Sequence, residues 1–405
     1  MKKLIDYMPP MLTNAELSKA LTILPEYDDS IRHQSVSQRL IELNKLFDIY
    51  LPSVMSSEIY SKLFLSLLRS LQKKDTPSAV QQSYQNRRDI SRGIIGGSDS
   101  FTILGQSGIG KSSAINRAIS LIAPQKAIIT ESPYRKLAPI ICVQTPYDCS
   151  VKGLLLEILR EVDEFLETDY YKYAIKSRAT TDNLIGTVAN VCLHSVGLLI
   201  IDEIQNVCSK NGSNLMGTLL NLINASGISV AFVGTLETKA FFENSTFQLS
   251  RRAIGLEYKN LLLDDYFINL CRALTKYLYV REDFTLTDDI IQWLYLHSNG
   301  ITSIVVTLIK DAQEIAILDG SEKLCIQSLT KAYNQRLGLL HNHINLNPTK
   351  LPPPKLKTTS PLIDENIENI ENDFILHTVL NVKRNGGDLI DLLRKQINII
   401  EVNIC

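Results

Sequence analysis

The segment Gly105–Ser112 constrains the fold of this chain more than any other feature. It reads Gly-Gln-Ser-Gly-Ile-Gly-Lys-Ser, with a short apolar run, Phe101–Leu104, before it and a helical pattern after it. Glycines let the backbone curl so that successive N–H groups face an anion, and the following helix directs the positive end of its dipole at the same point. The spacing is that of the Walker A motif, or P-loop, which binds the phosphates of a nucleotide.

Each residue type in the motif has a chemical task. Lys111 supplies a mobile positive charge for the β- and γ-phosphates, and the Ser112 hydroxyl is expected to ligate Mg²⁺. We therefore predict ATP and Mg²⁺ as cofactors, with Ser112 and Asp202 as the metal ligands. The predicted nucleotide-binding residues are Gly105, Gln106, Ser107, Gly108, Ile109, Gly110, Lys111, Ser112, Ser113 and Asp202.

A second motif follows farther along the chain. The run Leu198–Ile201 predicts a buried strand, and Asp202 and Glu203 stand at its carboxyl end. Asp202 is expected to hold Mg²⁺ directly or through water, and Glu203 to orient and deprotonate the attacking water. A helix cap at a strand end is the structural alternative. The acidic pair downstream of a P-loop favours the Walker B motif and hydrolysis of the nucleotide.

Thr235 and an arginine pair are the remaining catalytic candidates. The predicted buried strand Val230–Val233 runs into Gly234 and Thr235, where a hydroxyl could bond the γ-phosphate or the attacking water, the role called sensor 1. A simple turn residue is the alternative for Thr235. Arg251 or Arg252 could be the arginine that stabilises phosphoryl transfer, often in a neighbouring molecule's site. An intramolecular salt bridge or a sheet-edge cap is the alternative for this pair.

The hydrophobic pattern predicts an α/β domain with a parallel five-stranded sheet and helices on both faces, followed by a small all-α lid. The predicted strands are Phe101–Leu104, Ile140–Val143, Leu198–Ile201, Val230–Val233 and Leu256–Leu261, and the predicted helices include Ser112–Ile122, Val151–Leu166 and Ser303–Leu318. The predicted organisation is a helical N-terminal adaptor region at 1–92, the α/β ATPase domain at 93–262, the lid at 263–344, and a proline-rich linker with a partner-docking tail at 345–405.

Composition excludes several classes of protein. The 405 residues carry a net charge of −1, so any surface for nucleic acid must be a local patch. The cysteine count is odd, at 7, and no C-x-x-C pair is present, which argues against a zinc site or a disulfide framework and for reduced thiols in a cytosolic protein. The sequence shows no signal peptide and no membrane span, so we predict a cytoplasmic protein without a membrane partner.

The two Walker motifs, the Thr-ended strand, the arginine pair and the helical lid together resemble the AAA+ ATPases. Between the Walker motifs, Thr145–Leu155 reads Thr-Pro-Tyr-Asp-Cys-Ser-Val-Lys-Gly-Leu-Leu, and Asp202-Glu203-Ile204-Gln205 later precedes Gly234-Thr235. These runs look like the TnsC/TniB family of transposition regulators, over residues 90–340 or so. One departure is that Gly300-Ile301-Thr302-Ser303 lacks the sensor 2 arginine that many AAA+ proteins have at the start of a lid helix.

The resemblance implies a bacterial ATPase that assembles on double-stranded DNA as a ring or filament, with about six or seven subunits per ring or turn. ATP binding at subunit interfaces would favour assembly, and hydrolysis would favour release. The assembly would link a target-selection protein to a transposase, which the C-terminal tail would contact. In that family DNA contacts come from the loop and helix start between the Walker motifs, which by position are Tyr147, Ser150 and Lys152.

Two other functions stay open. One is a helicase or initiator loader of the IstB/DnaC or Orc kind, and the other is a nucleotide-gated signalling switch without DNA binding. The Ser-x-Lys-Gly-Leu run at Ser150–Leu154 favours the transposition regulator. No winged-helix pattern follows the lid, which argues against an origin-binding initiator. A signalling switch would usually carry a large sensor or repeat domain, and no such pattern is evident in the sequence.

Overall fold

A computed structural model of the chain describes residues 3–76, 99–131, 134–208, 212–243 and 255–338. The chain divides into two units, Met1–Lys350 and Leu351–Cys405, and every described residue belongs to the first.

The described helices before β1 are η1 (Leu4–Tyr7), α1 (Asn14–Leu21), η2 (Asp29–His33), α2 (Val36–Glu42), η3 (Leu43–Asp48) and α3 (Val54–Lys74). The elements of the α/β part are β1 (Phe101–Gly105), α5 (Lys111–Ile122), β2 (Ile128–Glu131), β3 (Tyr134–Gln144), α6 (Val151–Leu166), α7 (Tyr170–Lys176), α8 (Thr181–Ser195), β4 (Val196–Asp202), η4 (Ile204–Cys208), α9 (Gly212–Ser226), β5 (Ser229–Gly234), α10 (Thr238–Glu243) and β6 (Leu256–Tyr258). The helices that follow are α12 (Asp265–Leu274), α13 (Asp288–Ser298), α14 (Thr302–Leu318) and α15 (Ile326–Arg336).

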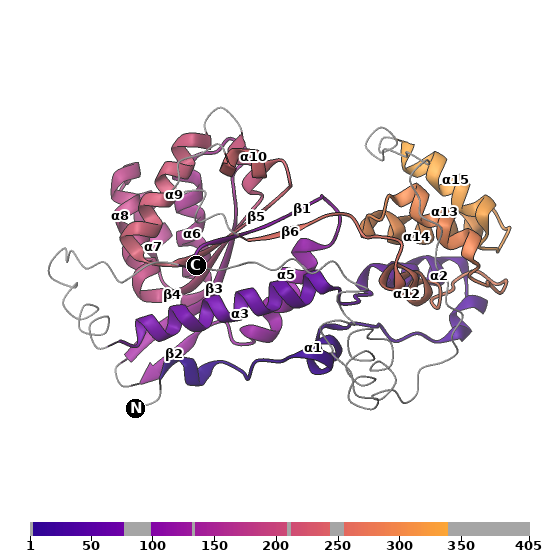
Figure 1. Cartoon of the computed structure of the whole chain (residues 1–405), viewed down its shortest axis with the longest axis horizontal. Helices are drawn as coiled ribbons and strands as arrows, with labels where there is room; N and C mark the ends of the chain where they lie inside the picture. The colour runs from indigo at the N-terminus through magenta and orange to yellow at the C-terminus, as the bar shows by residue number, and fades with distance from the viewer. Residues whose placement is uncertain (1–2, 77–98, 132–133, 209–211, 244–254, 339–405) are drawn as a thin grey trace, which may run out of the picture. The chain divides into compact units, whose positions relative to one another are not determined.

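The sheet has six strands in the order β2-β3-β4-β5-β1-β6 (Figure 1). Each of the five predicted strands is present, and they pair in parallel, as predicted. The prediction of five strands is corrected by the sixth, β2, which pairs antiparallel with β3 at one edge. Its four residues alternate between buried and exposed. A strand that short gave no separate periodic signal in the sequence.

Side chains on the central strands alternate between the two faces of the sheet, as the period of two for a strand requires. On β4, Leu198 and Ile200 join the core under α3 and α5, whereas Leu199 and Ile201 join the core under α6, α8 and α9. The helices accordingly form a layer on each face (Figure 1). Both faces being covered explains why β4 is apolar throughout rather than alternating.

Helix α6 shows how a sequence pattern selects one of these faces. Its predicted bounds agree with the structure, Val151–Leu166. Ser150 is the N-cap, and its hydroxyl accepts a hydrogen bond from the Gly153 N–H, 3.1 Å away. The buried positions recur every three or four residues and are Leu154, Leu155, Ile158, Leu159, Val162 and Leu166.

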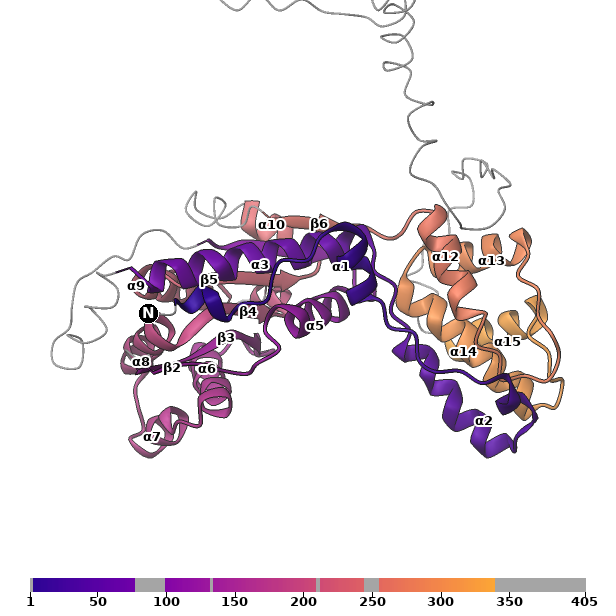
Figure 2. The same cartoon turned by 90° about the horizontal axis from the view of Figure 1, so that it is seen from below.

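The N-terminal region shares its hydrophobic side chains between two cores. Leu4, Leu17 and Leu21, together with α3, pack against β1 and α5. The segment that includes η3 packs instead with α12, α13, α14 and α15. Helix α2 lies beside α14 (Figure 2). Each fully buried leucine in these contacts contributes about 2 kcal/mol. The domain boundaries predicted at 92, 262 and 344 stay predictions.

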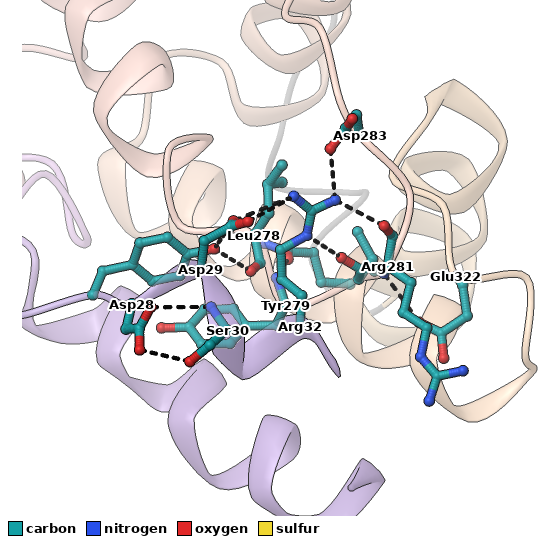
Figure 3. Close-up of polar contacts among 12 residues, drawn as sticks. Asp28, Asp29, Ser30, Arg32, Leu278, Tyr279, Arg281, Asp283 and Glu322 are labelled. Carbon is teal, nitrogen blue, oxygen red and sulfur yellow. Dashed lines mark hydrogen bonds and ion pairs between the residues drawn. The ribbon is translucent and has the colours of Figure 1, made fainter. Parts of the chain in front are cut away.

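Two buried arginines hold the N-terminal segment to the loops that precede α13 and α15. Arg32 donates to the carbonyl oxygens of Val280 and Arg281 and pairs with Asp283, as Figure 3 shows for the network around it. Arg39 is fully buried and forms a two-pronged ion pair with Glu322, at 2.6 and 2.7 Å. Backbone carbonyls and carboxylates accept from both guanidiniums and so offset the cost of burying their charges, although Arg39 Nε is buried without a hydrogen-bond partner among the described residues.

No helix in the described ranges is long and apolar enough to cross a bilayer.

Candidate functional site

The P-loop connects the end of β1 to the start of α5. Gly108 and Gly110 have φ of 82° and 96°, in the left-handed region that favours glycine. Gly110 is the N-cap of α5, whose first residue is Lys111. The strand, loop and helix therefore stand in the order that the motif requires, and the amino end of α5 supplies the favourable dipole for an anion.

Lys111 is held inside the loop rather than in solvent. Its Nζ donates to the carbonyl oxygens of Gly105 and Gln106, at 2.8 and 2.9 Å. Burial lowers the pKa of this ammonium, while the nearby carboxylates of Asp202 and Glu203 act in the opposite direction. The charge is thus kept at the point where the phosphates of a nucleotide would bind.

Ser112 and Asp202 meet although β5 separates their strands in the sheet. The Ser112 hydroxyl lies 3.5 Å from Asp202 Oδ2. A hydroxyl and a carboxylate are hard oxygen ligands, and Mg²⁺ in phosphate-binding sites uses one or two protein ligands with phosphate oxygens and water completing the shell. The pair fits a magnesium ion held together with a nucleotide.

Glu203 follows β4 with a left-handed backbone, φ 57°, an uncommon conformation for a residue other than glycine. Its N–H donates to Asp202 Oδ1 at 2.8 Å, and its exposed carboxylate accepts a hydrogen bond from the Gln205 side-chain amide. The turn therefore directs Asp202 and Glu203 to different tasks, with Asp202 toward the P-loop and Glu203 toward Gln205.

Thr235 stands at the end of β5, the strand between β1 and β4. Its Oγ1 is buried and has no hydrogen-bond partner among the described residues. Leaving a buried hydroxyl without a hydrogen bond costs about 1 to 3 kcal/mol of folding free energy. A ligand oxygen or a water that bonds this hydroxyl would therefore bind favourably. The position and the unpaired atom suit the predicted contact to a γ-phosphate or to the attacking water.

The structure brings together most of the predicted catalytic and nucleotide-binding residues. The P-loop, Asp202, Glu203 and Thr235 follow the carboxyl ends of three neighbouring strands, β1, β4 and β5. Arg251 and Arg252 lie outside the described residues. Their role as an arginine finger stays a prediction.

A cavity beside the P-loop was missed by the sequence reasoning. It has a volume of about 730 Å³, in the range of small-molecule sites. Much of its wall comes from the N-terminal segment, including Tyr50, Leu51 and Met55. Tyr266 fixes this segment by donating from its hydroxyl to the Leu51 carbonyl at 2.9 Å. The signal in the sequence was Pro52, because a proline disfavours helical backbone at the residue before it and so favours an extended segment at Leu51.

The start of α14 contacts the phosphate loop directly. The Ser303 N–H donates to the Gly108 carbonyl at 3.0 Å. A Cβ on Gly108 would lie 2.4 Å from Ser303 Oγ, so this approach requires glycine. Among Gly300, Ile301, Thr302 and Ser303 there is no arginine, and this contact is made by a serine.

The three predicted DNA-binding residues differ in their surroundings. Tyr147 is 91% exposed and stands in the loop between β3 and α6. Lys152 is exposed in the first turn of α6. Ser150 caps that helix, so its hydroxyl already has a structural partner. The geometry suits Tyr147 and Lys152 for an external contact better than it suits Ser150.

Comparison with known proteins supports the fold. Residues 95–241 match the family described as an AAA domain. Together with the sheet, this match confirms the predicted AAA+ P-loop fold with a helical region after it. No curated protein sequence matched the chain.

Several solved structures have a low sequence identity and a low TM-score to this chain. The Aeropyrum pernix ORC1 protein in complex with DNA has 12% identity and a TM-score of 0.44, over 84% of this chain and 83% of that one. The Aeropyrum pernix ORC2 protein in its ADPNP–ADP complexes has 15% identity and a TM-score of 0.40, over 59% of this chain and 62% of that one. Cdc6p from Pyrobaculum aerophilum has 14% identity and a TM-score of 0.44, over 64% and 67%. Similarity at this level does not identify a shared function.

Proposed function

We propose that this protein is an ATPase that assembles on double-stranded DNA in its ATP-bound form and regulates DNA transposition. The observation that carries the ATPase part is the meeting of the P-loop, Asp202, Glu203 and Thr235 at the ends of neighbouring strands. In this arrangement Lys111 and the start of α5 hold the phosphates, and Glu203 takes the proton of the attacking water. ATP with Mg²⁺ supplies the electrophilic phosphorus and the charge neutralisation.

The DNA part of the proposal rests on the exposed loop between β3 and α6. The exposed side chains of Tyr147 and Lys152 can reach the phosphate backbone of a bound DNA duplex. The run Thr145–Leu155, which includes both residues, carries the sequence resemblance to transposition regulators. Contacts of a lysine and a tyrosine to phosphates give affinity without base specificity and a strong dependence on salt. We further propose that residues 345–405, which lie outside the described residues, contact a transposase, and that a target-selection protein recruits the assembly.

The test is the size of the protein in solution with and without DNA. Light scattering after size-exclusion chromatography should show oligomers when a slowly hydrolysed ATP analogue and non-specific duplex DNA are both present at low salt. The Lys111→Ala variant should remain a smaller species under the same conditions, because the β- and γ-phosphates lose their cation. Added salt should dissolve the complex of the unaltered protein with DNA.

Other results would favour the other two functions. Protein that binds ATP but ignores duplex DNA at low salt would contradict the transposition proposal. ATP-dependent oligomers that form without DNA would favour the nucleotide-gated switch. Assembly only around a second ring-shaped protein would favour the helicase-loader function.

A further inference from the structure

A second cavity lies between residues 26–45 of the N-terminal segment and Tyr279, in the loop before α13. Its volume is about 750 Å³, similar to that of the cavity beside the P-loop. Polar side chains form most of its lining, and the charged ones are Glu26, Asp28, Glu42 and Lys45. We call it the acidic cavity. No residue of the candidate ATPase site lines it, so its composition needs an explanation of its own.

Two tyrosines fix the wall of the acidic cavity. The ring of Tyr27 meets those of Tyr277 and Tyr279 edge to face, with ring centroids 5.2 and 5.9 Å apart. The Tyr27 hydroxyl donates to the Leu278 carbonyl at 2.6 Å. The Tyr277 hydroxyl donates in the opposite direction, to the Pro25 carbonyl at 3.0 Å. These bonds hold the N-terminal segment against the loop before α13, so the cavity is formed before any ligand binds.

The third hydroxyl of this group, that of Tyr279, differs from the other two. Its side chain lines the acidic cavity and is only 1% exposed, yet its oxygen has no hydrogen-bond partner among the described residues. Burial and the Glu42 carboxylate raise the pKa of this hydroxyl, so it keeps its proton. A hydroxyl accepts as well as donates, and Tyr279 can therefore bond an N–H group of a ligand.

The carboxylates of the acidic cavity outnumber its ammonium groups. Glu42 pairs with Lys45, whose Nζ also donates to the Glu26 carbonyl at 3.3 Å. Glu26 and Asp28 are exposed, and neither forms an ion pair with another described residue. The Asp28 carboxylate accepts from the Ser30 N–H at 3.1 Å and from its hydroxyl at 2.6 Å, which fixes its orientation (Figure 3). Two negative charges therefore remain for a cation from outside.

The chemistry of the lining selects the kind of ligand. A guanidinium has five N–H donors for carboxylates and for a hydroxyl, and tyrosine faces attract it. Gln34 and Gln38 also line the acidic cavity, and their amides offer the donors and acceptors that a peptide backbone needs. A free polyamine has no carbonyl group to match them. One buried water, with a volume of about 30 Å³, would leave most of the cavity unfilled.

We propose that the acidic cavity binds an arginine side chain on an exposed segment of a partner protein. Glu26 and Asp28 pair with the guanidinium, the Tyr279 hydroxyl accepts one of its N–H groups, and Gln34 and Gln38 bond the adjacent backbone. The site uses neither the nucleotide nor DNA, so it goes beyond the proposed function and does not depend on it. Because its carboxylates are exposed, added salt weakens the binding.

The experiment measures binding of a fluorescent peptide, Ala-Arg-Ala-Arg-Ala, to the full-length protein by anisotropy at low salt. A peptide with citrulline in place of arginine keeps the shape without the charge, and we expect it to bind at least about tenfold more weakly. Glu26→Gln combined with Asp28→Asn should weaken the arginine peptide about fivefold. Glu16→Gln combined with Asp182→Asn removes two exposed carboxylates elsewhere and should leave the affinity unchanged.

Tyr279→Phe separates binding of a ligand from support of the fold. Because its hydroxyl bonds no other described residue, we expect the melting temperature to stay the same or rise, while the peptide affinity falls about fivefold. Tyr266→Phe is the matched control, since it removes a hydroxyl that donates to the Leu51 carbonyl at 2.9 Å. It should lower the melting temperature and leave the peptide affinity unchanged. Circular dichroism measures both melting temperatures.

Four results would overturn the arginine site. Equal binding of the citrulline peptide would mean that the charge is not recognised. An equal loss of affinity in the Glu16 and Asp182 control would make the attraction a general effect of net charge. A lower melting temperature for Tyr279→Phe with unchanged affinity would make its hydroxyl structural. Spermidine that displaces the labelled peptide at lower concentration than the unlabelled peptide does would identify a polyamine site. Failure of assembly on DNA would contradict the proposed function and leave these measurements unaffected.

Discussion

Glu203, directly after Asp202, combines a left-handed backbone with an exposed carboxylate. The turn after β4 lets Asp202 lie 3.5 Å from the Ser112 hydroxyl while Glu203 points elsewhere. Holding a residue other than glycine in this conformation costs about 1 kcal/mol. The cost is consistent with a position that is used in the mechanism.

The first prediction at this scale is for Glu203→Gln. The amide keeps the size of the side chain but cannot accept a proton, so we expect the turnover number to fall by about a hundredfold or more. ATP binding should persist, because the P-loop and Asp202 are unchanged. Steady-state ATPase rates together with binding of a fluorescent ATP analogue measure both effects.

The same variant should also accumulate as oligomers on DNA, because ATP would stay bound. Normal hydrolysis by Glu203→Gln would mean that another group is the base. Asp202→Asn is a useful contrast. It removes a proposed Mg²⁺ ligand and leaves Glu203 in place, so it should weaken the binding of Mg²⁺ rather than remove the base.

At the scale of elements, the Arg39–Glu322 pair joins α2 to the loop before α15. Arg39 also donates to the Tyr279 carbonyl at 2.9 Å. These contacts therefore tie the N-terminal segment, part of which lines the cavity beside the P-loop, to the loop that follows α14, the helix that carries Ser303.

We predict that Arg39→Met lowers the free energy of unfolding by about 2 to 3 kcal/mol, because it leaves Glu322 without its partner. Thermal melting followed by circular dichroism measures the change. Lys331→Met, which removes the exposed pair with Asp319, is the matched control and should leave the melting temperature unchanged. Adding Glu322→Met to Arg39→Met should restore part of the stability. A melting temperature for Arg39→Met equal to that of the control would contradict this account.

The same pair predicts a pH dependence. Hydrogen bonds from Arg39 hold the pKa of Glu322 below its ordinary value of 4.5. A lowered pKa in the folded state gives stability that is present above the ordinary pKa and is lost as the pH falls through the lowered value. The difference in melting temperature between the unaltered protein and Arg39→Met should therefore shrink below pH 4.5.

At the scale of the whole molecule, the described contacts of the candidate ATPase site all come from residues before Gly338. Deleting residues 346–405 is therefore expected to leave ATPase activity and DNA-dependent assembly unchanged. Recruitment of the transposase should be lost, because the proposed docking tail is gone. ATPase assays and co-purification with the transposase test the two parts separately. Loss of ATPase activity would mean that the tail belongs to the fold.

The sequence predicted much of the α/β part because its signals are local. The P-loop glycines, the apolar strands β1, β4 and β5, and the spacing of buried residues on α6 each follow from residues close in the chain. The sixth strand, β2, was missed because four residues carry too little periodicity. Arg251 and Arg252 lie outside the described residues, so their role as an arginine finger stays a prediction.

The amino-acid sequence by itself determined the phosphate-binding loop, the acidic pair and the apolar strands that carry them, because each depends on residues adjacent in the chain. Tertiary structure alone decided which distant groups meet. Its strand order set Thr235 between the Walker motifs, its packing brought Ser303 to Gly108, and its turn after β4 brought the Asn206 side chain to the Thr145 carbonyl. Such contacts depend on how strands and helices are ordered in space, and no local pattern of residues encodes that order.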